Sequence, residues 1–264
     1  MRNLLVILAL ALAPLPLASP ALAQSKSAPP AMRGGEPPGL PGIGSYDPRA
    51  PVSVRESPWN ALGVVRTTTG GRCTGTLIAP DVVLTAAHCL ISPRNRHFVE
   101  PDQVQFMQGY DRGRFSARAE VRSYRVGPGY DPQARGPGRE DWAVLLLARS
   151  LRGPTLPVFA REVEPRTPLL LGGYQQDRPE ELLADTGCRL LDRLPGILLH
   201  DCAGTRGASG APLLVRDGRG WAVAGIASRV APNMALGQAV EIGAVRHAIP
   251  GPGMAMAPEP LRRK

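Results

Sequence analysis

Three short stretches of the sequence carry side chains of the kinds that accept a proton or attack a carbon atom. The first is the string LTAAHC at 84–89, where His88 follows Ala86 and Ala87. Histidine is the side chain best suited to accept and return a proton near neutral pH, and small neighbours leave room around its ring. A single histidine is more often structural, so the inference depends on the whole string and on what accompanies it.

The second stretch is EDWAVLLL at 140–147, in which Asp141 opens a strongly apolar segment. A carboxylate at the start of a buried strand can be partly buried itself and can accept a hydrogen bond from an imidazole. Such a bond fixes the imidazole tautomer and stabilises the imidazolium that forms when the ring takes up a proton. The alternative is an aspartate that only starts a strand or turn, which is the commoner role of a lone aspartate.

The third stretch is GTRGASGAPLL at 204–214, where Gly207 and Gly210 flank Ser209. Glycine permits backbone angles that other residues avoid and lets a substrate approach the chain closely. Such a loop can turn the N–H groups of Gly207 and Ser209 toward one point, which would stabilise the oxyanion formed during acyl transfer. A Gly-x-Ser-Gly string by itself is common by chance and also occurs in ordinary loops.

In combination, the three strings resemble the trypsin-like (chymotrypsin-fold) family of serine proteases. The order His, Asp, Ser is that of chymotrypsin, whereas subtilisins and α/β-hydrolases use other orders. The resemblance extends more loosely over residues 52–250. It implies a catalytic triad of His88, Asp141 and Ser209, an oxyanion hole formed by the N–H groups of Gly207 and Ser209, and hydrolysis of peptide bonds through an acyl-enzyme.

Finer features resemble one branch of that family, the bacterial proteases related to glutamyl endopeptidase. These features are the strings SPWNALG at 57–63, GTLI at 75–78 and HDC at 200–202. In addition, Cys73 and Cys89 match the family's disulfide across the loop that carries the histidine.

Two departures from the family pattern concern how the serine loop is held. Vertebrate-type members carry an aspartate just before the nucleophile, and a freed chain end pairs with it; here that position is Ala208. The sequence also has no Arg/Lys-Ile-Val-Gly-Gly start, so activation by this ion pair is not expected. The loop must be held in another way, and a nearby Cys188–Cys202 disulfide is one candidate. A further departure is Ala211, which stands at a position where members of the family usually have glycine.

Substrate preference is only weakly encoded. By position in the family, the substrate pocket is expected to involve the following residues: Ala203, Thr205, Arg206, Ser228, Arg229 and Val230. No aspartate falls in the region of the pocket base, which argues against a trypsin-like preference for basic residues. Arg206 or Arg229 could favour an acidic side chain by charge complementarity, and the alternative is that both arginines are simply exposed.

The composition favours many short elements joined by turns, because the chain has 29 Pro and 30 Gly and only 5% aromatic residues. Short apolar runs bounded by turn residues are typical of antiparallel strands. Such runs occupy residues 61–65, 73–78, 82–85, 104–107, 143–147, 169–171, 189–191, 197–200, 212–215 and 221–227. Only residues 86–90 and 244–249 look briefly helical. We therefore expect an all-β fold, and the resemblance implies two antiparallel six-stranded β-barrels with a short C-terminal helix.

The two ends of the chain are expected to lie outside the folded domain. Residues 1–23 have a positive start, an apolar run and small residues near Ala23, which is the pattern of a secretory signal peptide cleaved after that residue. A membrane anchor is the alternative, but the apolar run is short for a span and prolines interrupt its continuation. Residues 24–50 are predicted to be a disordered linker or pro-segment, 51–250 the protease domain and 251–264 a disordered tail.

Four cysteines follow the predicted signal peptide, and an even number in an exported chain suggests two disulfides. Four cysteines allow three pairings, and the pairing of sequence neighbours is Cys73–Cys89 with Cys188–Cys202. A zinc site is the alternative, but the sequence has no Cys-x-x-Cys pair. We expect no metal and no cofactor.

The formal net charge is +9, and the basic residues are spread along the chain without a dense block or interleaved aromatic residues. This pattern favours a solvated basic surface over a surface that binds nucleic acid. The expected partner is a protein or peptide substrate. We expect a monomer that does not insert stably into a membrane and that is secreted or periplasmic after signal-peptide cleavage.

Three other functions are alternatives to a serine protease. A catalytically inactive protein of the same fold could bind peptides or envelope components, because fold does not guarantee function. A serine esterase or lipase would carry a Gly-x-Ser-x-Gly elbow between a strand and a helix, whereas here Ala211 takes the last glycine position and Pro212 leads into a strand. A metalloprotease is disfavoured because the sequence has no His-Glu-x-x-His.

Overall fold

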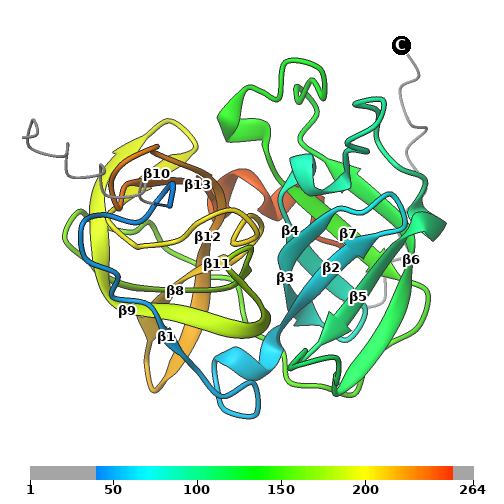
Figure 1. Cartoon of the computed structure of the whole chain (residues 1–264), viewed down its shortest axis with the longest axis horizontal. Helices are drawn as coiled ribbons and strands as arrows, with labels where there is room; N and C mark the ends of the chain where they lie inside the picture. The colour runs from blue at the N-terminus through cyan, green and yellow to red at the C-terminus, as the bar shows by residue number, and fades with distance from the viewer. Residues whose placement is uncertain (1–39, 252–264) are drawn as a thin grey trace, which may run out of the picture. The chain divides into compact units, whose positions relative to one another are not determined.

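The structure of the protein, a computed structural model, describes residues 40–251 (Figure 1). The predicted signal peptide (1–23), the first part of the predicted linker (24–39) and the predicted tail from residue 252 onward lie outside the described residues. Most of the regular elements are strands, and the strands form two antiparallel groups.

The first group is a closed barrel of six strands in the order β2-β3-β4-β7-β6-β5. The strands are β2 (Leu62–Thr67), β3 (Arg72–Ala79), β4 (Val82–Thr85), β5 (Val104–Gln108), β6 (Ala117–Val126) and β7 (Ala143–Leu147). Every residue of β4 and β7 is buried, as their continuous apolar runs predict. Closure removes open strand edges, and side chains such as Phe106 and Leu145 fill the interior.

The second group also closes on itself. Its strands are β8 (Pro168–Gln175), β9 (Arg178–Leu194), β10 (Ile197–His200), β11 (Pro212–Asp217), β12 (Gly220–Val230) and β13 (Gly237–Glu241). They pair in the order β8-β9-β10-β13-β12-β11, and β11 pairs back with β8. The length of β9 makes closure possible, because it pairs with β8 along one part and with β10 along another. The predicted all-β fold of two six-stranded barrels is therefore confirmed.

Within the described part of the chain, the helical segments are all short 3-10 turns. The one expected at 86–90 is η2 (Ala87–Leu90), and the expected C-terminal helix consists of two turns, η5 (Ile242–Ala244) and η6 (Arg246–Ala248). The remaining turns are η1 (Trp59–Ala61), η3 (Pro101–Gln103) and η4 (Gly138–Glu140). None of the helices formed by residues 40–251 is long and apolar enough to cross a membrane.

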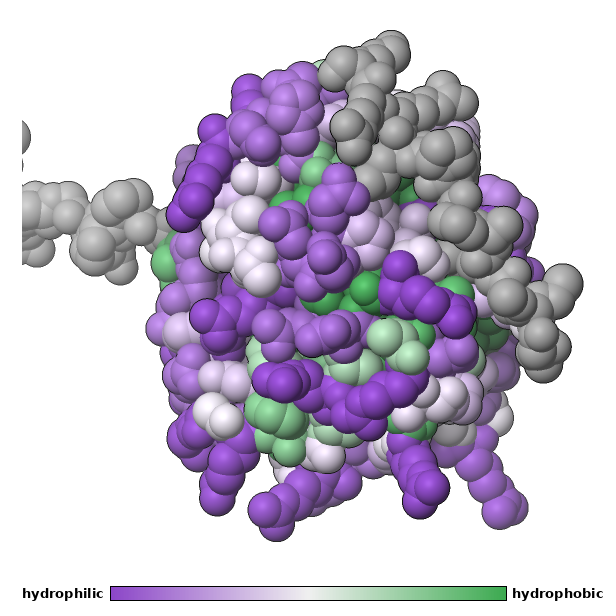
Figure 2. All heavy atoms as spheres, turned by 90° about the vertical axis from the view of Figure 1, so that its right-hand side faces the viewer, coloured by the Kyte–Doolittle hydropathy of each residue, from purple (hydrophilic) through white to green (hydrophobic). Residues whose placement is uncertain are grey.

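Strands β6 and β13 are not revealed by continuous apolar runs. In β6, buried Ala119 and Val121 alternate with exposed Arg118, Glu120 and Arg122. An alternation with a period of two marks a strand that turns one face to the core and the other to water. Figure 2 views the molecule from the right-hand side of Figure 1, where β6 lies. The surface there is mostly hydrophilic with only small hydrophobic areas.

Residues 40–50 differ from the prediction, which assigned them to a disordered linker. Arg49 is buried, and Ala50–Pro51 form the short strand β1 beside β9. The segment also forms a backbone hydrogen bond with the second barrel, since the Gly42 N–H donates to the carbonyl of Ala231 at 2.8 Å. The composition of the segment does not reveal these contacts, because their partners lie far away in the sequence.

Phe106 in β5 tests how much the first barrel depends on its core. We expect Phe106→Ala to lower the free energy of unfolding by about 3–5 kcal/mol, because the fully buried ring would leave a cavity. Phe115→Ala is the matched control: that ring is 43% exposed, and its loss is expected to change stability by less than about 0.5 kcal/mol. Urea unfolding with the disulfides intact measures both values, and equal losses would contradict a close-packed barrel.

Candidate active site

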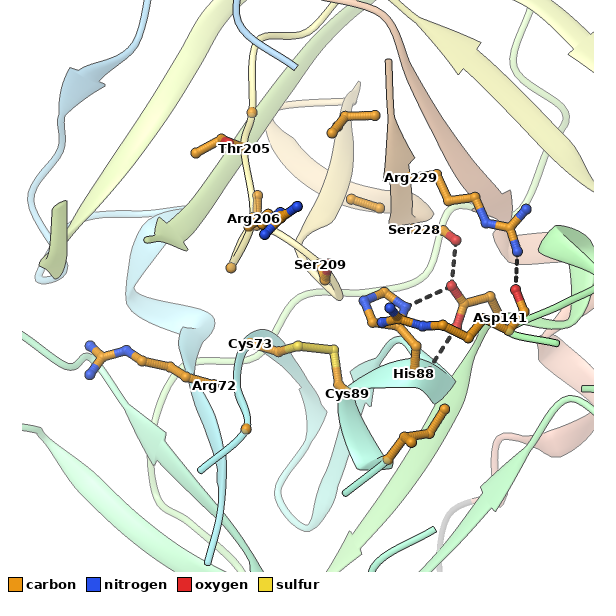
Figure 3. Close-up of a pocket in the computed structure, with 18 of the residues that line it drawn as sticks. Arg72, Cys73, His88, Cys89, Asp141, Thr205, Arg206, Ser209, Ser228 and Arg229 are labelled. Atoms are coloured by element: carbon orange, nitrogen blue, oxygen red, sulfur yellow. Dashed lines mark hydrogen bonds and ion pairs between the residues drawn. A yellow bond between two sulfur atoms is a disulfide. The ribbon is translucent and has the colours of Figure 1, made fainter. Parts of the chain in front are cut away.

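A cleft of about 840 Å³ is lined by residues from both barrels (Figure 3). The first barrel contributes His88 and Asp141, and the second contributes the loop that carries Ser209. The three candidate catalytic side chains therefore reach one cavity, although they are far apart in the sequence.

His88 lies in the 3-10 turn η2, which follows β4. Ala86 and Ala87 before it are fully buried, so their small side chains let the turn pack closely against the barrel. The next residue, Cys89, has its sulfur 2.07 Å from that of Cys73 on β3. The turn is thus attached on both sides of the histidine, whose side chain remains 14% exposed toward the cleft.

Asp141 follows the 3-10 turn η4 and precedes β7, and its side chain is 2% exposed. The carboxylate holds His88 twice: Oδ2 lies 2.8 Å from His88 Nδ1, and Oδ1 accepts the His88 backbone N–H at 2.9 Å. The Ser228 hydroxyl on β12 also donates to Oδ2. One carboxylate therefore receives hydrogen bonds from both barrels.

The charge of Asp141 determines the tautomer of the histidine. Burial raises the pKa of Asp141, but the hydrogen bonds from His88 and Ser228 outweigh burial, and the pKa lies below its usual value of 3.8. Because an ionised carboxylate only accepts hydrogen bonds, Nδ1 of the neutral His88 ring carries the proton. The other nitrogen, Nε2, keeps a free lone pair, which is the state that a general base requires.

The loop before β11 (Pro212–Asp217) holds Ser209 between two glycines in the left-handed region. Gly207 has φ +94° and Gly210 has φ +80°. A Cβ atom at Gly210 would lie 2.2 Å from the Thr85 hydroxyl oxygen, and one at Gly207 would lie 2.5 Å from the Tyr174 carbonyl oxygen. Glycine at both positions is what allows the loop to lie this close to the strands of both barrels.

Ser209 lies near His88 in the cleft (Figure 3). Among residues 40–251, no hydrogen bond joins the Ser209 hydroxyl to the imidazole, whose Nδ1 is bonded to Asp141. Bonds of this kind are often long in free enzymes and shorten when substrate binds. The Ser209 carbonyl accepts the backbone N–H of Thr74 on β3 at 2.9 Å, which fixes the serine loop to the barrel that carries the histidine.

The N–H groups of Gly207 and Ser209 are oriented by the carbonyl groups of the same peptide bonds. The carbonyl preceding Gly207 accepts the N–H of Gln176 at 2.8 Å, and the carbonyl preceding Ser209 accepts the N–H of Ala211 at 2.9 Å. In a trans peptide the N–H points opposite to the C=O, so the two N–H groups point away from these partners. Neither N–H has an acceptor among the described residues, which leaves two donors free beside the serine.

A family model described as a trypsin-like peptidase domain matches residues 73–226, a range that contains His88, Asp141 and Ser209. The chain belongs to the trypsin-like peptidase family. A trypsin-like protease of Streptomyces glaucescens is 28% identical over 184 residues, which are 59% of this chain and 64% of that protein. The match thus spans less than two thirds of the relative's own length.

Solved structures share the fold of this trypsin-like peptidase. A structure of Glu endopeptidase in complex with MPD has a TM-score of 0.68 at 19% identity, and the match covers 78% of this chain and 98% of that one. The structure of the Vibrio cholerae VesB protease has a TM-score of 0.60 at 19% identity, with coverages of 76% and 65%. At these identities the likeness shows the two-barrel, chymotrypsin-like fold.

Five of the six predicted pocket residues of the peptidase line the cleft. They are Thr205, Arg206, Ser228, Arg229 and Val230. Ala203 is fully buried instead, and its N–H donates to the Asp185 carboxylate at 2.9 Å. The side chain of Ser228 is engaged with Asp141, a contact that its position in the sequence does not reveal.

His200 also lines the cleft, although it is not among the predicted pocket residues. It ends β10 and is 1% exposed, and burial lowers its pKa to about 4. Its Nδ1 accepts the N–H of Cys202 at 3.2 Å, so the ring is neutral with a proton on Nε2, which has no partner among the described residues. The string HDC is the only local signal, and it does not indicate that the ring packs against Gly237 on β13.

Cys188 on β9 has its sulfur 2.17 Å from that of Cys202, so the two pairs are the sequence-local ones. Among the described residues, two groups of His, Cys or Asp side chains lie close enough together to share a metal ion, and each contains one of these cysteine pairs. Disulfide sulfurs lack the thiolate that binds a metal, so neither group offers a thiolate site.

Asp141 makes the stability of the protein depend on pH in a defined direction. A carboxyl group whose pKa is lowered on folding contributes stability above its ordinary pKa of 3.8, and this contribution is lost as the pH falls through the folded-state pKa. We therefore expect the unfolding free energy of wild type minus that of Asp141→Asn to fall between about pH 5 and about pH 3. Urea unfolding of both proteins at the two pH values measures this difference, and a constant or rising difference would contradict it.

Proposed function

We propose that this peptidase is an exported serine endopeptidase in which Ser209 attacks the peptide bond, His88 transfers the proton and Asp141 orients the histidine. The proposal depends on one arrangement. A carboxylate bonded to His88 Nδ1 leaves Nε2 available in the same cleft as Ser209, and the N–H groups of Gly207 and Ser209 have no acceptor among residues 40–251. This arrangement supplies a base, a nucleophile and an oxyanion site together.

In the first half of the reaction, His88 Nε2 takes the proton from Ser209 Oγ as that oxygen bonds to the carbonyl carbon of the substrate. The carbonyl oxygen becomes negatively charged, and the N–H groups of Gly207 and Ser209 donate to it. His88 then gives the proton to the leaving nitrogen. The C–N bond breaks, the amine product departs, and the acyl group remains on Ser209.

In the second half, a water molecule replaces the amine. His88 Nε2 takes a proton from the water while its oxygen bonds to the acyl carbon, and the same two N–H groups stabilise the second oxyanion. The proton returns to Ser209 Oγ as the ester bond breaks, and the acid product is released. The enzyme regains its starting state, so no cofactor is needed.

Asp141 acts through His88 in both halves. Its two hydrogen bonds to the histidine keep the proton on Nδ1, and its negative charge stabilises the imidazolium formed in each transfer. The Ser228 hydroxyl fills part of the remaining hydrogen-bonding capacity of the carboxylate, which helps to keep that carboxylate ionised although it is buried.

Export is part of the proposal. Residues 1–23 have the composition of a signal peptide, and we propose that residues 24–39 act as a linker or pro-segment and that residues from 252 onward form a tail. Two cysteine pairs at bonding distance support an oxidising compartment, because disulfides persist in secreted and periplasmic proteins.

Removal of the nucleophile tests the proposal. We expect Ser209→Ala to lower kcat by at least ~10⁴-fold and to abolish labelling by a fluorophosphonate, because the probe bonds to the activated serine oxygen. Ser53→Ala, which changes an exposed serine outside the cleft, is expected to keep both properties. A labelled Ser209→Ala variant would overturn the proposal, and so would a folded wild type that neither labels nor cleaves, which would favour a peptide-binding protein.

The charge around the cleft supports an acidic substrate. Four arginines line it: Arg72, Arg135, Arg206 and Arg229. The one carboxylate among the lining residues is Asp141, which is buried and bonded to His88. An acidic peptide would therefore meet an excess of positive charge in the cleft.

A cleavage-site profile tests this preference. We expect a peptide library to be cut preferentially near Asp or Glu, and Arg206→Ala with Arg229→Ala to lower kcat/KM for an acidic peptide by about tenfold. Cleavage of a neutral peptide is expected to change little, and Arg152→Ala, an exposed arginine outside the cleft, serves as the control. A profile without acidic enrichment would remove the preference and leave the serine mechanism untouched.

A further inference from the structure

The segment before β1 carries a buried charge, Arg49, whose side chain is only 2% exposed. Its guanidinium makes two contacts with Asp47, through Nε at 2.9 Å and Nη2 at 2.8 Å. It also binds Asp177 through Nη2 at 2.8 Å and donates from Nη1 to the amide oxygen of Gln175 at 2.6 Å. A buried guanidinium requires several acceptors, and these residues supply them.

Two of the residues bonded to Arg49, Gln175 and Asp177, lie on either side of Gln176. Gln175 ends β8, and Asp177 lies in the turn that leads to β9. Between them, the Gln176 N–H donates at 2.8 Å to the carbonyl of the peptide bond whose N–H belongs to Gly207. The contact that orients this N–H therefore comes from a residue whose two neighbours are both bonded to Arg49.

A second path leads from Arg49 to the same loop. The amide oxygen of Gln175 that accepts from Arg49 also accepts the backbone N–H of Thr205 at 2.7 Å. One residue upstream, the Gly204 N–H donates to the carbonyl of Gly42 at 3.1 Å. Gly42 has φ +79°, and a Cβ atom there would lie 2.0 Å from the Gly204 carbonyl oxygen, so this close approach requires glycine.

We propose that Arg49 is a positioning residue for the serine loop: by fixing residues 175–177, it holds the peptide bond that presents the Gly207 N–H to the oxyanion. This inference rests on the proposed serine mechanism and adds a residue to it. Arg49 acts through Gln175 and Gln176 and does not touch the reacting atoms. It takes the place of the ion pair that Ala208 makes impossible beside the nucleophile.

The chemistry of arginine suits this role. Its planar guanidinium presents several N–H donors in a fixed geometry and can bind two carboxylates and an amide oxygen at the same time. Without it, the amide oxygen of Gln175 would lose a charged donor, and the carboxylates of Asp47 and Asp177 would repel each other. The turn at 175–177 would then lose its fixed position, and the peptide bond before Gly207 would be free to rotate.

The experiment compares Arg49→Met with Arg193→Met in the full exported protein. Methionine keeps much of the aliphatic stem and removes the guanidinium. Arg193 is the matched control, because it lies on β9 of the same barrel and binds two carboxylates, those of Glu162 at 2.7 Å and Glu241 at 2.8 Å, but does not line the cleft. Each variant is assayed for kcat, for KM and for its rate of labelling by a fluorophosphonate, whose phosphoryl oxygen needs the same two N–H donors.

We expect Arg49→Met to lower kcat and the labelling rate together by about 10–100-fold, with KM changed by less than about threefold. Arg193→Met is expected to stay within about twofold of wild type in all three. Gln175→Met is expected to resemble Arg49→Met, and the double variant to be no worse than either single one, because both break the same chain of contacts. Arg49→Lys keeps the charge but not the planar fork, and is expected to fall between wild type and Arg49→Met.

The outcomes separate this inference from the serine mechanism. A wild type that does not label or cleave refutes the mechanism itself. A wild type that labels, beside a folded Arg49→Met variant with kcat within about threefold, refutes only the role of Arg49. Equal losses in Arg49→Met and Arg193→Met, or a loss confined to KM, also refute it. If Arg49→Met does not fold, the Arg49→Lys and Gln175→Met variants decide the matter by the same readouts.

Discussion

The buried carboxylate of Asp141 is the constraint on which the rest of the site depends. Removal of an ion from water costs several kcal/mol, and only well-placed hydrogen bonds offset that cost. The two N–H groups of His88 and the hydroxyl of Ser228 provide these bonds. Since His88 belongs to the first barrel and Ser228 to the second, the carboxylate can be satisfied only when the barrels are packed together. Packing of the two barrels against each other and stabilisation of the buried carboxylate are therefore coupled.

Thr74 on β3 fixes the position of the serine loop through hydrogen bonds, as Asp141 fixes the position of the histidine. Its N–H donates to the Ser209 carbonyl, and its hydroxyl donates to the Gly207 carbonyl while accepting the N–H of Tyr174 on β8. One small polar residue thus joins the first barrel, the second barrel and the serine loop. The loop has few side chains of its own to pack, so its position depends on backbone groups that neighbouring strands satisfy. Two closed barrels supply the rigid strands that such a loop requires.

The sequence predicts most strongly what is encoded within a few residues. The strings around His88, Asp141 and Ser209 are local, and the apolar runs that become β4 and β7 are local as well. Contacts between distant segments leave no such mark. The environment of Arg49 could not be predicted, because Gln175 and Asp177 lie more than a hundred residues away and the surrounding composition is that of a linker. A family position suggests a pocket role for Ser228 but not its bond to Asp141, since one strand residue can contribute backbone to one feature and side chain to another.

The serine loop is held without an acidic residue beside the nucleophile, and the hydrogen bonds explain how. The carbonyls before Gly207 and Ser209 are both occupied, by N–H groups of Gln176 and Ala211. Rotation of either peptide bond would break such a bond and leave a carbonyl unpaired, which costs about 1–3 kcal/mol in a buried site. The two N–H groups, which have no acceptor among the described residues, are therefore held on the side of each peptide bond opposite its carbonyl. An oxyanion site is effective to the extent that its donors need not reorganise during the reaction. For the proposed oxyanion site, that preorganisation would come from contacts made during folding, including those of Arg49 in the segment that precedes the first barrel.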